Sequence, residues 1–157
     1  MVGYRRIWPE IGRHHMRITD VLRTKGTAVA TVGADATVAE LVAALAEHNV
    51  GALVVLGQDG IAGIVSERDV VRRLHDRGAD LLTARVAEIM TTGVLTCGPQ
   101  DSVDSLTVLM TERRIRHVPV VSDGELVGIV SIGDVVKSRI SQLEEDQDQL
   151  TAYIAQG

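Results

Sequence analysis

An internal repeat limits what this chain can fold into more than any other feature of its sequence. Residues 63–71 recur 65 positions later as residues 128–136, with a glycine, a serine, an aspartate and paired valines at matching places. Held without a gap, this offset also pairs Thr31 with Thr96. The chain of 157 residues therefore contains two repeats of one unit, and neither repeat is large enough to bury a hydrophobic core alone. We expect the two repeats to pack against each other about a pseudo-twofold axis.

Each repeat predicts the same order of short elements, β-α-β-β-α, which makes the fold α+β. Hydroxyl side chains before an apolar run at helical spacing indicate helix N-caps, and short apolar runs joined by glycine-containing turns indicate hairpins. A helical turn, related by an offset of 68 rather than 65, opens each repeat. The expected positions are opening turns at 18–23 and 85–90, brief strands ending near Thr31 and Thr96, helices capped by Thr37 and Ser102, hairpin strands at 52–56, 61–65, 118–121 and 126–130, and closing helices from Glu67 and Gly133.

Residues 1–15 lie outside the repeat and differ from it in composition. They hold the only tryptophan and three arginines. We expect either an ill-ordered or added extension there or a functional arm, because chain ends are the usual place for disorder. His14 and His15 are adjacent but have no further ligand residues around them, so they predict no metal site.

Residues 141–157 continue the last helix beyond the second repeat. Its apolar side chains and one glutamine alternate at spacings of three and four, beside a cluster of acidic residues. The stripe consists of Ile140, Leu143, Gln147, Leu150 and Ile154. The pattern indicates an amphipathic helix that either lies on its own domain or contacts a second chain. The resulting division is an extension at 1–15, a first repeat at 16–80, a second repeat at 81–140 and a helical extension at 141–157.

Composition narrows the classes of function. A net charge of −5 and an aromatic content of 2% argue against nucleic acid as a partner, because phosphate binding needs a dense basic face. No apolar run approaches the roughly 18 residues that a membrane span needs, and no signal-peptide pattern opens the chain. The single cysteine, Cys97, cannot form an intrachain disulfide and fits a reducing compartment. We expect a soluble, cytoplasmic protein that contacts neither membrane nor nucleic acid.

The repeated segment predicts a strand that ends at a glycine and a serine, followed by a helix with an aspartate in its first turn. Gly63 lacks a Cβ, so another backbone or a flat base can approach it closely. Ser66 falls at the helix start, where free amides favour a phosphate oxygen, and Asp69 can accept hydrogen bonds from both hydroxyls of a ribose. The second repeat places Gly128, Ser131 and Asp134 at the same positions.

A purely structural interpretation of the same residues is also open. Ser66 and Ser131 can serve only as N-caps, with Asp69 and Asp134 favouring the positive helix end. The occurrence of the arrangement twice, in register within a full-length repeat, favours the ligand-binding interpretation.

The chain resembles the CBS domain family in its tandem form, called a Bateman module. The resemblance covers about residues 18–140, and it rests on the two Gly-x-x-Ser-x-x-Asp segments, on Arg-His-Val-Pro-Val at 116–120 and on Val-Ala-Glu-Ile-Met at 86–90. It implies two clefts related by a pseudo-twofold axis. Many such pairs bind AMP, ADP, ATP, NAD(H) or S-adenosylmethionine and require no cofactor. They often assemble as disc-like dimers, and some members regulate another protein.

Roles for individual residues follow from the resemblance. It implies that Asp69 and Asp134 hold ribose, and that Ser66 and Ser131 hold phosphate or ribose. Further implied ligand contacts are Thr31 and Thr96 beside the adenine, Gly63 and Gly128 at the strand ends, Arg116 and His117 before Pro119 on the phosphates, and Arg68 and Lys137 as additional phosphate contacts. The first repeat carries Gly51 and Ala52 where the second carries Arg116 and His117. The two clefts are therefore not equivalent, and we expect one cleft to bind more tightly.

Three functions are compatible with these features. The first is a regulatory module that binds an adenosine nucleotide between its repeats and signals to an unidentified partner by a conformational change. The second is a ligand-independent homodimeric scaffold whose clefts are vestigial. The third is an enzyme, but Ser66 and Ser131 have no neighbouring base, and no P-loop or nucleophile elbow is present. We therefore predict no catalytic residues.

Overall fold

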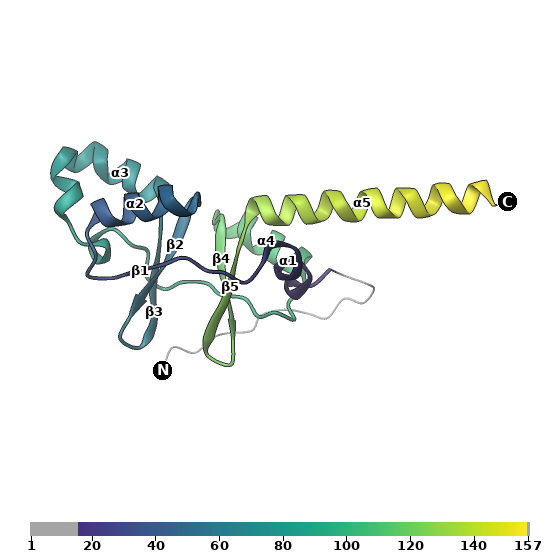
Figure 1. Ribbon diagram of the computed structural model, residues 1–157, viewed down its shortest axis with the longest axis horizontal. Helices are drawn as coiled ribbons and strands as arrows, with labels where there is room; N and C mark the ends of the chain where they lie inside the picture. The colour runs from purple at the N-terminus through teal and green to yellow at the C-terminus, as the bar shows by residue number, and fades with distance from the viewer. Residues whose placement is uncertain (1–15, 157) are drawn as a thin grey trace.

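The computed structural model describes residues 16–156, and the elements there follow the order expected from the repeat (Figure 1). The predictions about residues 1–15, including His14 and His15, lie outside the described residues. The first repeat contains α1 (Ile18–Lys25), β1 (Thr31–Gly33), α2 (Val38–His48), β2 (Ala52–Gly57), β3 (Gly60–Ser66) and α3 (Glu67–Arg77). The two 3-10 turns η1 (Gly78–Thr83) and η2 (Val86–Glu88) lead to α4 (Val103–Arg113), β4 (His117–Ser122), β5 (Glu125–Ser131) and α5 (Ile132–Ala155).

Two small sheets form the centre of the molecule. In the first, β1 runs parallel to β2, and β2 pairs antiparallel with β3; in the second, β4 pairs antiparallel with β5. The expected strand before Thr96 is reduced to a single parallel bridge between Cys97 and Val120. That bridge corresponds to the pairing of Val32 with Val55 in the first repeat. The α+β fold is confirmed.

One strand boundary differs from the sequence-based expectation. Thr31 begins β1 instead of ending it, because the parallel pairing starts where Thr31 lies opposite Val54 and continues to Gly33. The predicted caps are confirmed: the amide of Glu40 donates to Thr37 Oγ at 3.2 Å, and that of Ser105 donates to Ser102 Oγ at 3.0 Å. The closing helix of the second repeat starts at Ile132, one residue earlier than expected.

Each sheet is covered by the opening segment of the other repeat. The apolar face of α1 joins one core with the second sheet, and the η2 segment joins the other core with the first sheet. Backbone hydrogen bonds hold each opening segment against the other repeat. The Ile18 amide donates to the Asp101 carbonyl at 3.0 Å, and the Val86 amide donates to the Ala36 carbonyl at 2.8 Å. The repeats are therefore interlocked rather than merely adjacent, and each core depends on both.

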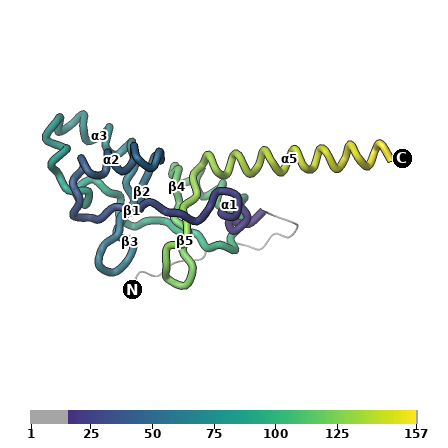
Figure 2. Tube along the Cα trace, viewed as in Figure 1, coloured from purple at the N-terminus to yellow at the C-terminus, as the bar shows by residue number. Residues whose placement is uncertain are grey.

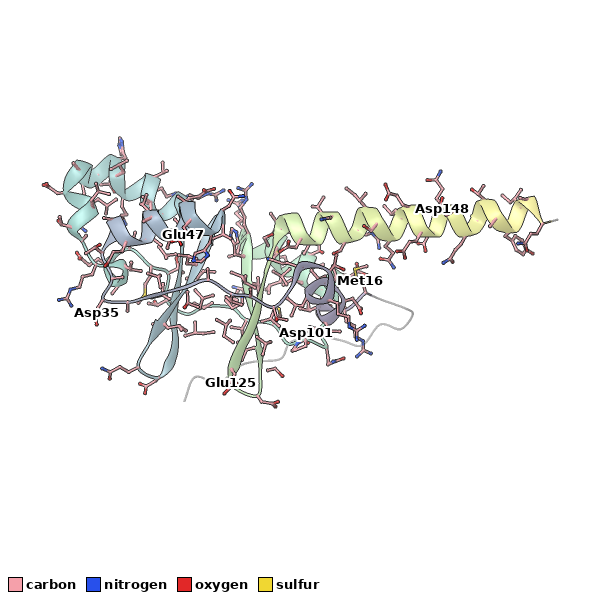
Figure 3. All side chains as sticks on the ribbon, viewed as in Figure 1. Met16, Asp35, Glu47, Asp101, Glu125 and Asp148 are labelled. Carbon is pink, nitrogen blue, oxygen red and sulfur yellow. The ribbon has the colours of Figure 1, made fainter. Side chains whose placement is uncertain are left out.

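Helix α5 extends far beyond the two sheets (Figures 1 and 2). Val135, in its first turn, is its one buried residue and packs in the core of the second repeat. Figure 3 shows the outer part of the helix, including Asp148, with no other helix or strand of residues 16–156 beside it. Helix α5 continues to Ala155, and the outer part of its apolar stripe does not lie on its own domain in this structure. No helix within the described chain has the length and apolar character that a membrane crossing requires.

Candidate ligand site at two strand-to-helix corners

The first corner joins β3 to α3 through a reciprocal cap. The Asp69 amide donates to Ser66 Oγ at 3.3 Å, while the Ser66 amide and hydroxyl donate to Asp69 Oδ2 at 2.8 and 3.0 Å. Ser66 keeps an extended backbone and the helix starts directly after it, since a side-chain oxygen here satisfies amides that have no helical partner. The corner thus holds a partly buried carboxylate close to the positive end of a helix dipole.

The second corner repeats this cap and adds a cation. The Ser131 amide donates to Asp134 Oδ2 at 2.8 Å, and the Asp134 amide donates to Ser131 Oγ at 3.2 Å. Lys25 Nζ, at the end of α1, donates to Asp134 Oδ2 at 2.5 Å and to the Ile129 carbonyl at 2.8 Å. Burial acts to raise the pKa of Asp134, but the hydrogen bonds from Lys25 and Ser131 outweigh it, and the pKa lies below its ordinary value.

His117 lies between the two corners. It pairs with Ser131 across the second hairpin, and a Cβ built on Gly51 would lie 3.6 Å from its Nε2 and 3.5 Å from Glu67 Oε1. Burial and the positive charge of Lys25 lower the pKa of His117, against the opposing influence of Asp134 and Glu67. A neutral imidazole therefore faces a group of charged side chains from both repeats.

The glycines at matching positions of the two repeats, Gly63 and Gly128, make room for the opening segments of the opposite repeats. A Cβ at Gly63 would lie 2.8 Å from both the Thr91 carbonyl and Met90 Sδ, and one at Gly128 would lie 2.7 Å from Leu22 Cδ2. Sequence reasoning left open whether a backbone or a base approaches here. In this structure the opening segment of the opposite repeat occupies both places.

Two hollows on the helical side of the molecule are related by the 65-residue offset. The first, about 480 Å³, lies between α2 and α3 and has an apolar wall that includes Val42, Val50 and Val71. The second, about 290 Å³, lies at the end of α4 and includes Arg68 from the first repeat. At the positions of Asn49, Gly51 and Glu67 in the first hollow, the second carries Arg114, Arg116 and Ile132. The second hollow is therefore basic, and neither hollow is lined by Asp69 or Asp134.

The structure brings some of the predicted site residues together and separates others. Ser66 with Asp69, and Ser131 with Asp134 and His117, form the two corners; Arg68 and Arg116 share the basic hollow. Gly63, Pro119 and Gly128 are buried, whereas Thr31 and Lys137 are exposed on β1 and α5, and Thr96 is half-buried beside the bridge at Cys97.

Sequence reasoning missed Lys25 and Arg114. Lys25 has no counterpart in the second repeat, where Gly93 stands at the offset of 68. A cation at the end of one opening helix, absent from the same place in the other repeat, was a signal, but the carboxylate that it meets lies 109 residues away. Arg114 ends α4 in a left-handed conformation with a φ of 54°, as Asn49 ends α2.

A family model described as the CBS domain matches the chain twice, over residues 18–76 and 86–141. This chain belongs to the CBS domain family. It is 38% identical to the mitochondrial CBS domain-containing protein CBSX3 of Arabidopsis thaliana, over 94% of this chain and 76% of the relative. The crystal structure of a CBS-domain containing protein from Agrobacterium tumefaciens is similar with a TM-score of 0.77 and 41% identity, covering 83% of this chain and 99% of the other.

One solved structure bears on the ligand of a CBS pair. The CBS domain pair of protein MJ0100, crystallised in complex with 5′-methylthioadenosine and S-adenosyl-L-methionine, is similar with a TM-score of 0.73 and 25% identity. The similarity covers 82% of this chain and 98% of that chain. Both of those ligands contain an adenosine group, which carries the ribose hydroxyls and the base that the corners were predicted to hold.

Proposed function

We propose that this CBS pair is a regulatory module that binds an adenosine-containing ligand at its strand-to-helix corners. The observation that carries the proposal is the pair of partly buried carboxylates, Asp69 and Asp134, each held by a capping box at a helix start. A carboxylate that is already fixed can accept both ribose hydroxyls with little loss of side-chain entropy. The adenosine ligands of the related MJ0100 pair support the same class of ligand.

The proposed ligands are AMP, ADP, ATP, NAD(H) or S-adenosylmethionine, with the tighter site at the second corner. Lys25 donates to Asp134, His117 pairs with Ser131 of the same corner, and Arg116 directly precedes His117 in the chain. In the first repeat, Gly51 and Ala52 stand at the places of Arg116 and His117. Because phosphates are bound chiefly through charge-assisted hydrogen bonds, we assign the phosphate-bearing end of the ligand to the second corner.

Signalling follows from the interlocked repeats in this proposal. A ligand that contacts a corner and the crossing segment beside it binds one relative arrangement of the repeats better than others. Lys25 is a direct route for this effect, since it joins α1 to the carboxylate that receives the ribose. A regulated partner protein reads the arrangement, and a reducing compartment such as the cytoplasm fits the free, buried Cys97. We assign no catalytic step to the chain.

A thermal-shift panel tests the proposal. AMP, ATP, NADH and S-adenosylmethionine are each compared with the matching guanosine or adenine-free compound, such as GMP for AMP. A ligand that binds the folded state must raise the melting temperature, and the rise must grow with ligand concentration. We expect a rise with at least one adenosine compound and none with its control. The absence of a shift with every adenosine compound would contradict the proposal.

A second candidate function is a homodimeric scaffold without a ligand. Val71, which is 65% exposed, lies on α3 at the edge of the apolar hollow, and Leu74, which is 45% exposed, follows it one turn later on the same helix. Apolar side chains exposed together on one face favour association. A disc-like dimer that pairs the closing helices α3 and α5 would cover Val71 and Leu74, whether the protein is a ligand-binding module or a scaffold. Dimers that form equally with and without nucleotide, together with a negative thermal-shift panel, would favour the scaffold.

A further inference from the structure

The free part of α5 carries a stripe that matches one side of a two-helix coiled coil. Residues at spacings of three and four follow one another along the exposed helix: Gly133, Val136, Ile140, Leu143, Gln147, Leu150 and Ile154. The apolar ones among them are exposed by 52% to 70%. Side chains at this spacing stay on one face when helices pair along their length. Within the described chain no other helix or strand lies beside the outer part of α5, where Asp148 is labelled (Figure 3).

Charges flank the stripe in an ordered way. Lys137 and Arg139 lie beside its first half, and Glu144 and Asp146 lie seven residues later beside its second half. Among residues 16–156, none of the four forms an ion pair; Arg139 donates only to Gln142, at 3.3 Å. In heptad terms all four occupy the positions next to the core, where charges select the partner and its orientation.

We propose that the α5 helices of two chains pair antiparallel, about a twofold axis that passes between Ser141 and Gln142. In this register Ile140 packs on Leu143 of the second chain, and Val136 packs on Gln147 of the second chain. Lys137 then meets Glu144 of the other chain, and Arg139 meets Asp146. The twofold axis doubles each pair, so four ion pairs of opposite charge flank the core. This inference is independent of the ligand proposal.

The neighbouring registers are disfavoured by the same charges. A shift of the axis toward the C-terminus by half a heptad places Glu144 opposite Glu144 and Asp146 opposite Asp146. A shift toward the N-terminus places Lys137 opposite Lys137 and Arg139 opposite Arg139. Like charges in these positions are destabilising, so only the central register combines apolar layers with attraction.

The parallel arrangement is also less favourable. It retains the pairing of Arg139 with Glu144 across the interface but leaves Lys137 and Asp146 without opposite charges. It also stacks Gln147 on Gln147 in the core, where polar side chains reduce stability. The antiparallel arrangement instead sets Gln147 against Val136, close to the end of the paired region.

The start of α5 offers room for the other helix to approach. In the central register Leu150 of the second chain lies opposite Gly133. Gly133 is exposed, and a Cβ added to it would meet only Ser131 Oγ, at 3.6 Å. Because glycine has no side chain, the Leu150 side chain of the second chain can pack against the backbone of α5 at this point without displacing a neighbour. The first repeat has Arg68 at the position of Gly133. The glycine in the second repeat is then explained by the room that Leu150 of the second chain needs.

Cysteine pairing tests the contact directly. Val136→Cys and Gln147→Cys are made as separate full-length variants, mixed and oxidised under mild conditions. Each chain then carries only one of the two new cysteines, so a disulfide between positions 136 and 147 can form only between two chains. We expect a mixed disulfide dimer only when the two variants are combined. Cys97 is buried and stays out of the exchange. Glu145→Cys, on the outward face of α5, replaces Gln147→Cys as the matched control and should not cross-link.

The other outcomes overturn the proposal in distinct ways. A disulfide dimer formed by Gln147→Cys alone would show a parallel pair. A mixture that cross-links no better than the Glu145→Cys control would show that α5 does not pair with itself. As a second measurement, Lys137→Glu with Arg139→Glu should lower the yield of mixed disulfide, and adding Glu144→Lys with Asp146→Lys should restore it. A yield unaffected by these reversals would contradict the assigned register.

Discussion

The ammonium nitrogen of Lys25 lies 2.5 Å from a carboxylate oxygen of Asp134, although 109 residues separate the two in the chain. The contact joins the opening helix of the first repeat to the cap of the last helix. Its side chains are 32% and 21% exposed, so water screens this pair less than the other ion pairs of the described chain. It is also the feature that makes the two corners unequal, because Asp69 has no such cation beside it among the described residues.

Replacing Lys25 should therefore destabilise the fold more than replacing an exposed cation. We expect Lys25→Met to lower the free energy of unfolding by about 1–2 kcal/mol, because it leaves a partly buried carboxylate with fewer donors. Arg23→Met, which removes the exposed pair with Asp20, should cost about 0.5 kcal/mol or less. Urea unfolding of both variants at pH 7 measures the difference, and equal losses would contradict the assigned importance of the contact.

The acid dependence of the Lys25 contact has a defined sign. The pKa of Asp134 is lower in the folded chain than its ordinary value of 3.8, so the unfolded chain binds the proton first as the pH falls. The stabilisation by Asp134 is complete above that value and is lost as the pH falls through the folded pKa. The gap in unfolding free energy between wild type and Lys25→Met should accordingly close in acid below pH 3.8.

The close packing at the repeat glycines predicts unequal costs for alanine. At Gly63 the new Cβ would meet the Thr91 carbonyl, which is fixed because it accepts from the Ile64 amide while the Thr91 amide donates to the Ile64 carbonyl. At Gly128 it would meet the end of the Leu22 side chain, which can turn aside. We expect Gly63→Ala to cost about 1–3 kcal/mol and Gly128→Ala to cost less. Gly33→Ala is the control, since no atom lies within 4 Å of its Cβ. Thermal unfolding ranks the three, and a larger loss at Gly128 would refute this packing argument.

His117 should make stability depend on pH near neutrality. Burial, with Lys25, holds its pKa below the ordinary 6.5, so the unfolded chain binds a proton that the folded chain does not. The contribution of neutral His117 to the free energy of unfolding is complete above pH 6.5 and is lost as the pH falls toward the pKa of His117 in the folded chain. We expect the wild type to lose more stability than His117→Gln between pH 7.5 and pH 5.5. His75→Gln, an exposed change on α3, should behave like wild type; an unchanged slope in His117→Gln would contradict the assigned burial.

The buried thiol predicts low reactivity. Burial, with the nearby charge of Asp101, raises the pKa of Cys97 to about 12, and the thiolate is the reactive form. We expect no alkylation of the folded protein by iodoacetamide at pH 8 and rapid alkylation in urea. Mass spectrometry at timed intervals distinguishes the two. Modification of the folded protein at the rate of the unfolded one would show that Cys97 is accessible.

The sequence predicted the repeat, the order of the elements and the helix caps at Thr37 and Ser102, because each rests on local patterns of spacing and side-chain type. It did not reveal which sheet each opening segment covers. The offset shows that residues 18–22 and 86–90 are alike, but similarity alone cannot assign α1 to the sheet of the second repeat. That choice depends on the path of the linkers in space.

The same limit applies to the candidate site. Ser66, Asp69, Ser131 and Asp134 were found because they recur at a fixed spacing within a few residues. Lys25 was missed because its contact crosses 109 residues and has no counterpart in the other repeat. The glycines were ambiguous for a related reason: a pattern can indicate a close approach without identifying what approaches.

Calorimetric titration of the adenosine ligand that gives the largest thermal shift tests the central claim most directly. Asp69→Ala, Asp134→Ala and Glu40→Ala each remove the carboxylate of a capping box, which should cost about 1 kcal/mol of stability, and Asp134→Ala should cost more because it also loses the contact with Lys25. Only the first two are placed at the corners. We predict that at least one of them weakens binding by about tenfold or more while Glu40→Ala binds like wild type. Wild-type affinity in both aspartate variants would contradict the assignment of the ribose to these carboxylates.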